Sequence, residues 1–122
     1  MHFQYSQASA LSLKQLSYLL AVSETLNFTR AAELCFVTQS TLSGGIAELE
    51  RALGVQLVER DRQRVAITPV GAEVVQRARS ILSASQDLIA RAQMAADPAC
   101  GEFRLGIIPT IAPYVLGKIL TQ

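Results

Sequence analysis

The sequence has few of the residues on which most catalytic and metal sites depend. It contains one histidine, two cysteines and no tryptophan among its 122 residues. The histidine, His2, stands apart from other groups that bind a metal or activate a nucleophile, and the chain has no glycine-rich phosphate loop. We therefore expect no enzyme, no metal site and no cofactor.

Signals for export and for membrane insertion are scarce as well. No apolar run approaches the ~20 residues of a membrane-spanning helix, and the first residues lack the basic region and apolar core of a signal peptide. Two cysteines are too few for the disulfide framework of a small secreted domain. With 50% hydrophobic and 17% charged residues, the chain is typical of a soluble folded protein, and we expect it in the cytoplasm.

The pattern that is present, over residues 28–46, predicts two short helices joined by a tight turn. The second helix, expected at 39–53, carries apolar residues at four- and three-residue spacing, which places on one buried face Leu42, Ile46, Leu49 and Leu53. Its opposite face carries mostly short or polar side chains: Ser40, Ser43, Gly44, Ala47 and Arg51. A helix with such an outer face can approach another surface closely.

The residues around the turn support this geometry. Thr38 is placed to cap the second helix, and the free amides beside it favour an anion such as a phosphate. Ala31 and Ala32 allow the helices to cross closely, and we expect Leu34 and Val37 to close the inner angle. On this stretch alone, an ordinary pair of helices whose small residues only ease packing is an alternative.

The flanking residues extend this pair into what we call the head, residues 12–68. A capping-box pattern that begins at Ser12 precedes a helix expected at 12–25. The first helix of the pair is expected at 29–35, capped by Asn27 or Thr29.

A short β-hairpin is expected after Gly54, which ends the preceding helix. Apolar residues alternate with polar ones on both sides of a turn at 61–63: Val55, Leu57, Val65 and Ile67. Behind a helix pair such a hairpin is a wing, and its arginines, Arg60, Arg62 and Arg64, favour the DNA backbone or the minor groove. The alternative is a solvated hairpin with a charged tip. Because the net charge is only +1, we expect long-range attraction to nucleic acid to be modest.

A long helix is expected at 69–97, with Pro69 in its first position and Pro98 beyond its end. Small and apolar residues recur in it at four- and three-residue spacing: Val74, Ala78, Ile81, Ser85, Leu88 and Ala92. Leu82 and Ile89 follow this series one position on, and we call all eight residues the apolar stripe. The head is too small to cover the whole stripe, so we expect a homodimer interface with a second copy of the chain. A core helix of a larger domain is the alternative.

Residues 98–122 indicate a strand followed by the start of a helix, which is too little to form a core. We therefore expect the chain to be cut from a longer protein whose next domain is of α/β type. The expected order is a flexible tail at 1–11, a winged helix-turn-helix domain at 12–68, a dimerisation helix at 69–97 and the start of a truncated regulatory domain at 98–122. The predicted fold class is mainly α.

In this order the motifs resemble the N-terminal part of the LysR-type transcriptional regulators, over about residues 12–122. The likeness rests on Asn27-Phe28-Thr29-Arg30-Ala31-Ala32-Glu33, Thr38-Gln39-Ser40-Thr41-Leu42-Ser43, Leu53-Gly54-Val55-Gln56-Leu57-Val58-Glu59-Arg60 and Thr68-Pro69-Val70-Gly71. Residues 42–46 and 106–114 are most similar to the peroxide-sensing OxyR branch of that family. Ser40 and Gly44 depart from the proline and arginine that many members carry there.

The resemblance implies a regulator that binds palindromic operators in double-stranded DNA as a dimer or tetramer, with a C-terminal domain that senses an effector. The residues implied to face bases are Gln39, Ser40, Ser43 and Gly44. The residues implied to face the DNA backbone or minor groove are Arg30, Thr38, Thr41, Arg60, Arg62 and Arg64. In the peroxide-sensing branch the helix that begins near Thr110 lines the sensing pocket, so Thr110 is assigned to an incomplete effector site.

The peroxide-sensing branch further implies an activator of the oxidative stress response. Its redox-active cysteines correspond neither to Cys35, which we expect to pack in the core, nor to Cys100, which lies in a linker. Two alternatives stay open: a LysR-type regulator that responds to a small metabolite, and a winged-helix module that binds another protein.

Overall fold

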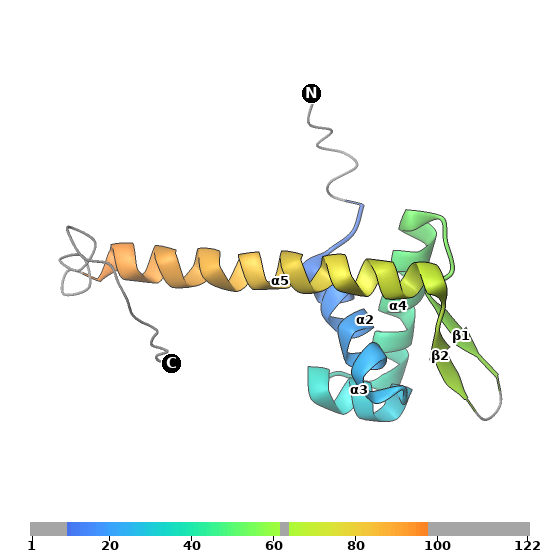
Figure 1. The fold of residues 1–122 in the computed structure, drawn as a ribbon. Coiled ribbons are helices and arrows are strands. Elements are labelled where there is room, and N and C mark those ends of the chain that lie inside the picture. Colours follow the sequence, from blue (N-terminus) through green and yellow to red (C-terminus); the bar gives the residue numbers. More distant parts are fainter. Residues whose placement is uncertain (1–9, 62–63, 98–122) are drawn as a thin grey trace, which may run out of the picture. The chain divides into compact units, whose positions relative to one another are not determined.

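The computed structural model describes residues 10–61 and 64–97 (Figure 1). Its elements are α2 (Leu13–Thr25), α3 (Phe28–Cys35), α4 (Gln39–Leu53), β1 (Val58–Arg60), β2 (Val65–Ile67) and α5 (Pro69–Ala96). The contacts divide the chain into two units, one ending at Ser83 and the other beginning at Ala84. The mainly α fold with a winged helix-turn-helix is confirmed. The expected strand and helix at 98–122 lie outside the described residues, as do residues 1–9 of the expected tail.

Side-chain caps determine where the first three helices begin. The Ser12 hydroxyl accepts a hydrogen bond from the Gln15 amide at 3.2 Å, and the Gln15 side chain accepts one from the Ser12 amide at 3.0 Å. Asn27 and Thr38 cap α3 and α4 by accepting from the amide three residues further on. The expected caps are therefore confirmed, and of the two candidates for α3 it is Asn27, which leaves Thr29 inside the helix.

The core lies between α2, α3 and α4, which contact one another pairwise. Leu19, Leu42, Ile46 and Leu49 are fully buried, which confirms three of the four residues expected on the buried face of α4. The fourth, Leu53, is 37% exposed. Leu53 is exposed because it is the last residue of α4 and borders an open groove instead of the core.

The turn between α3 and α4 differs from expectation at one residue. Leu34 is 58% exposed and does not close the inner angle. The core side of α3 is formed by Phe28, Ala31 and Ala32. Leu34 follows Ala31 by three residues, and at about 100° per residue it lies at the edge of this side and not at its centre. Val37 is partly buried against the core, as expected.

The hairpin is an antiparallel pair in which Val58 lies opposite Ile67. It is shorter than expected, because Val55 and Leu57 precede β1. The carboxylate of Glu50, in α4, accepts hydrogen bonds from the amides of Leu57 at 2.8 Å and Val58 at 3.1 Å. The base of the hairpin is therefore bonded to α4.

The start of α5 is bonded to the segment before β1. The Thr68 hydroxyl accepts a hydrogen bond from the Gly71 amide at 2.9 Å and donates one to the Gln56 carbonyl at 2.7 Å. Further along, Val75 and Ala78 belong to the core. Ala78 is only 1% exposed, which corrects its expected place in an interface between two copies: the chain's own head covers it. No helix in the described part of the chain has the length and apolarity needed to cross a lipid bilayer.

Two adjacent glycines in α4 lie in different surroundings. A Cβ atom on Gly45 would lie 2.6 Å from Cδ2 and 2.7 Å from Cε2 of the buried Tyr18 ring. At Gly44 the described residues place nothing within 4 Å of such an atom. Gly45 therefore allows α2 and α4 to cross closely, whereas Gly44 has room for a side chain.

We expect alanine at these two positions to change stability in opposite directions. Gly44→Ala should raise the free energy of unfolding by roughly 0.5–1 kcal/mol, because alanine has the higher helix propensity. Gly45→Ala gains the same propensity but must displace a buried ring, so it should lower the free energy of unfolding by about 1–2 kcal/mol. Urea unfolding of both variants measures the difference, and equal effects would contradict this account.

Candidate nucleic-acid interface

The N-terminal half of α4 presents a polar surface without bulky side chains. Its exposed residues are Gln39, Ser40, Thr41 and Gly44, and Ser43 is partly buried. The Thr38 hydroxyl donates a hydrogen bond to Thr41 Oγ1 at 2.8 Å and lies 3.3 Å from Ser40 Oγ. These hydroxyl groups form one network at a helix N-terminus, where the free amides and the helix dipole favour negative charge.

Gln39, the first residue of α4, is held by the preceding helix. The hydroxyl of Thr29, in the first turn of α3, donates a hydrogen bond to Oε1 of Gln39 at 3.1 Å. Both side chains are exposed. The sequence analysis considered Thr29 only as a candidate cap of α3. It did not predict the contact with Gln39, because the two residues lie in different helices and no spacing rule for one helix connects them.

Arg30, Arg60 and Arg64, which are predicted to contact the DNA backbone or minor groove, are exposed on the head. Arg30 lies in the first turn of α3, and Arg64 precedes β2. The Arg64 amide donates a hydrogen bond to Oδ1 of Asp61 at 2.8 Å, which closes the hairpin turn. Arg62 lies outside the described residues.

Arg60 has a contact that its sequence position did not indicate. Its guanidinium lies over the Phe28 ring, 4.4 Å from the ring centroid. Such a cation–π contact stabilises the pair by a fraction of a kcal/mol to about 1 kcal/mol at an exposed site. It connects β1 to the first residue of α3 and keeps this positive charge beside the helix pair.

The acidic residues of α4 interact with the chain itself. Oε1 of Glu48 accepts a hydrogen bond from Nε2 of Gln15 at 3.2 Å, and Glu50 binds the base of the hairpin. Residues 39–47, the N-terminal part of α4, contain no carboxylate. A chain with a net charge of only +1 thus keeps negative charge away from the part of α4 that carries the predicted site.

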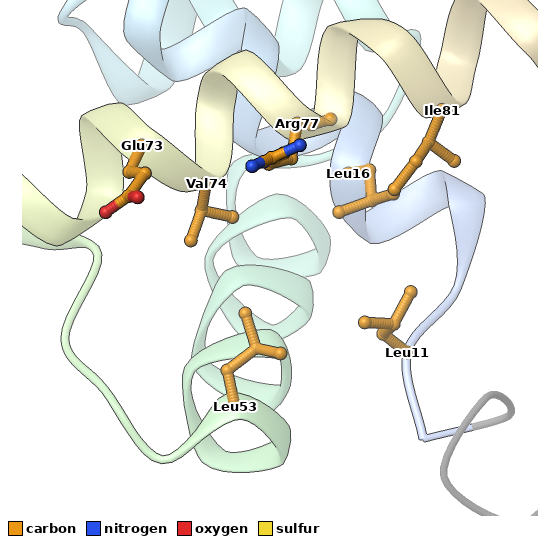
Figure 2. Close-up of a pocket in the computed structure, with 8 residues that line it drawn as sticks. Leu11, Leu16, Leu53, Glu73, Val74, Arg77 and Ile81 are labelled. Carbon is orange, nitrogen blue, oxygen red and sulfur yellow. The ribbon is translucent and has the colours of Figure 1, made fainter. Parts of the chain in front are cut away.

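A second feature is an apolar groove of about 320 Å³ (Figure 2). Its lining residues are Leu11, Leu16, Leu53, Val74, Ala78 and Ile81, with Glu73 and Arg77 as its charged members. The sequence analysis did not include Leu11 in any site. The sequence does contain a pattern that predicts its contact with Leu16. Leu11 directly precedes the Ser12 cap and Leu16 is the fourth residue after it, which is the spacing of a hydrophobic staple.

The apolar stripe of α5 is divided between buried and exposed residues. Val74 and Leu82 pack partly buried against the core, and Ser85 is also partly buried. The large exposed apolar residues of α5 are Val70 at 37%, Ile81 at 43%, Leu88 at 68%, Ile89 at 53% and Met94 at 38%. Ala92 is exposed as well. Met94 was missed because it does not fall on the four- and three-residue spacing.

Cys35 is partly buried against the core, so its expected packing is confirmed in part. Burial raises the pKa of its thiol, and its Sγ lies 4.0 Å from the Ser17 carbonyl oxygen. A raised pKa lowers the fraction of reactive thiolate. Cys100 and Thr110 lie outside the described residues. Within 10–61 and 64–97, no group of three or more histidine, cysteine, aspartate or glutamate side chains could hold a metal ion.

Comparison with known proteins identifies bacterial regulators among the relatives of this chain. Residues 13–72 match the family described as bacterial regulatory helix-turn-helix protein, lysR family. The chain is 57% identical over 115 residues to the HTH-type transcriptional regulator EstR of Acinetobacter baylyi, an alignment that covers 94% of this chain and 38% of that protein. It is 48% identical over 100 residues to a probable hydrogen peroxide-inducible genes activator of Mycobacterium xenopi, covering 82% of this chain and 53% of that protein. The chain thus spans well under two thirds of either relative.

A solved structure matches the fold. The crystal structure of the BenM_DBD/benA site 1 DNA complex has a TM-score of 0.67 and 35% identity, and covers 72% of this chain and 99% of that chain. The relatives are named as regulators, which confirms the expectation that the chain is no enzyme. The mycobacterial relative agrees with the predicted likeness to peroxide-responsive regulators. Sequence and fold together show that the chain belongs to the LysR family of bacterial regulatory helix-turn-helix proteins.

Proposed function

We propose that this chain binds operator DNA sequence-specifically, with α4 in the major groove and the hairpin against the backbone or minor groove. One observation carries the proposal: the N-terminal half of α4 presents short polar side chains and no carboxylate, while its other face is fixed in the core. In this proposal the bases are read by Gln39, Ser40, Ser43 and Gly44. The backbone or minor groove is contacted by Arg30, Thr38, Thr41, Arg60, Arg62 and Arg64.

Selection of bound duplexes from a random pool tests this proposal. Enrichment of one motif, with an affinity that falls steeply as salt increases, would support it, because contacts between arginine and phosphate release counterions. Binding without a preferred sequence and without a salt dependence would favour the alternative of a protein-interaction module.

We further propose that two copies associate through α5, so that the operators are palindromic, and that the full-length protein forms tetramers. The exposed Ile81, Leu88 and Ile89 support an interface of this kind, since exposed apolar residues at heptad spacing favour a partner helix. In the proposed organisation, the DNA-binding domain at 12–68 is followed by the dimerisation helix at 69–97 and by the start of a regulatory domain.

The full-length protein is proposed to be a cytoplasmic regulator that responds to an effector. The name of the mycobacterial relative supports peroxide. The name of the EstR relative does not mention peroxide, which keeps a small metabolite as the alternative. Burial raises the pKa of Cys35, so we do not assign peroxide sensing to this residue.

The first functional prediction separates base contacts from backbone contacts. Gln39→Ala should cost roughly 1–3 kcal/mol of binding free energy and relax the preference at one operator position. Arg64→Ala should weaken binding to all sequences alike and reduce the salt slope by about 1. Titrations over several salt concentrations, with the selected duplex and with single-base variants, measure both effects. Unchanged affinity and preference in Gln39→Ala would contradict the role given to α4.

The second prediction concerns association. Ile81→Arg should produce monomers that no longer bind a palindrome, because an interface would bury an arginine without a partner. Ser83→Arg is the matched control, since Ser83 is exposed on the opposite side of α5, so the same charge added there should leave the dimer intact. Sedimentation at tens of micromolar measures the oligomeric state, and a monomeric wild type would refute the interface.

The third prediction concerns redox behaviour. Mild peroxide should change neither the affinity nor the footprint of this chain, because burial raises the pKa of Cys35 and limits its thiolate. Binding is measured with and without peroxide in wild type and in Cys100→Ser, which removes any disulfide between the Cys100 residues of two copies. A peroxide effect that persists in Cys100→Ser would show that Cys35 reacts.

A further inference from the structure

The contact between Thr29 and Gln39 determines which group of Gln39 is available to a ligand. A carboxamide has one acceptor oxygen and one amino group with two donor hydrogens. Because the Thr29 hydroxyl donates to Oε1 at 3.1 Å, the oxygen is turned toward α3. Across residues 10–61 and 64–97, Nε2 of Gln39 has no acceptor.

Gln39 is also the longest polar side chain at this end of α4. The neighbouring hydroxyl groups are short and bonded to one another: Thr38 Oγ1 donates to Thr41 Oγ1, accepts from the Thr41 amide and lies 3.3 Å from Ser40 Oγ. Gln39 alone among these residues has a hydrogen bond to the other helix of the pair. Its amino group is therefore the far-reaching donor of this surface, and its orientation depends on α3.

We infer that Thr29 is a positioning residue for base recognition, which holds the Gln39 carboxamide with its amino group toward the major groove. This inference rests on the proposed binding of DNA. In the major groove, guanine and thymine present acceptors, adenine presents an acceptor at N7, and cytosine presents a donor at N4. The base in contact with Gln39 is therefore guanine, thymine or adenine, and cytosine is disfavoured.

Without the Thr29 hydroxyl, the Gln39 carboxamide can rotate by about 180°, which exchanges the positions of its oxygen and its amino group. The terminal torsion of glutamine is broad and roughly two-fold, so Oε1 can then turn outward and accept a hydrogen bond from cytosine N4 or adenine N6. Thr29 thus narrows the base preference without contacting the base itself.

The test compares wild type with Thr29→Val, Thr29→Ser, Gln39→Ala and Gln39→Glu. Duplex selection gives the wild-type motif, Gln39→Ala identifies the position that Gln39 reads, and dissociation constants are then measured for the four bases there. Thr29→Val keeps the branched shape but loses the hydroxyl, and it should reduce discrimination against cytosine by about threefold to tenfold, the range expected for one exposed hydrogen bond. Thr29→Ser should keep the wild-type profile. Gln39→Glu offers only acceptor oxygens and should shift the preference to cytosine.

Several results would overturn the inference and leave DNA binding itself intact. These are a Thr29→Val profile equal to that of wild type, loss of discrimination in Thr29→Ser, no position affected by Gln39→Ala, or a wild-type preference for cytosine at the Gln39 position. A wild type that enriches no motif would overturn the proposed function instead. Thermal unfolding checks that each variant is folded. Gln39→Glu tests whether a donor at residue 39 determines the base preference, without any change to Thr29.

Discussion

The close crossing of α2 and α4 is the contact on which the rest of the head depends. At this crossing the Tyr18 ring occupies the space that a Cβ atom on Gly45 would need, and Leu42, Ile46 and Leu49 are fully buried beside it. Because one face of α4 is fixed in this way, helical periodicity alone determines which residues point outward. The polar surface of α4 is thus already arranged in the free chain.

Side-chain contacts extend this fixed arrangement to the hairpin. The Glu50 carboxylate binds two amides at the base of β1, Thr68 connects the start of α5 to Gln56, and Arg60 lies over Phe28. Each contact joins two elements that are separate in the chain. A two-stranded hairpin is at best marginally stable alone, so these attachments account for its order in this small head.

The sequence was sufficient for features that depend on local chemistry. Caps at Ser12, Thr38 and Gly54, together with helical periodicity, predicted the helix boundaries within one residue. It was insufficient where a residue's partner lies in another element. Ala78 has the spacing of the apolar stripe, yet whether the head or a second copy covers it depends on tertiary packing that a one-dimensional pattern does not contain. The same applies to Thr29, whose hydroxyl has a partner in the next helix.

The short side chains on the outer face of α4 also have an entropic consequence. Glycine has no side-chain rotamers to lose, and serine and threonine have few, so ordering Ser40, Thr41, Ser43 or Gly44 against a partner costs little conformational entropy. Gln39 is the flexible residue of this surface, and its hydrogen bond to Thr29 restricts it before any partner arrives. The surface is therefore nearly rigid. It has no long, freely rotating side chains that could adjust its shape to fit a different partner.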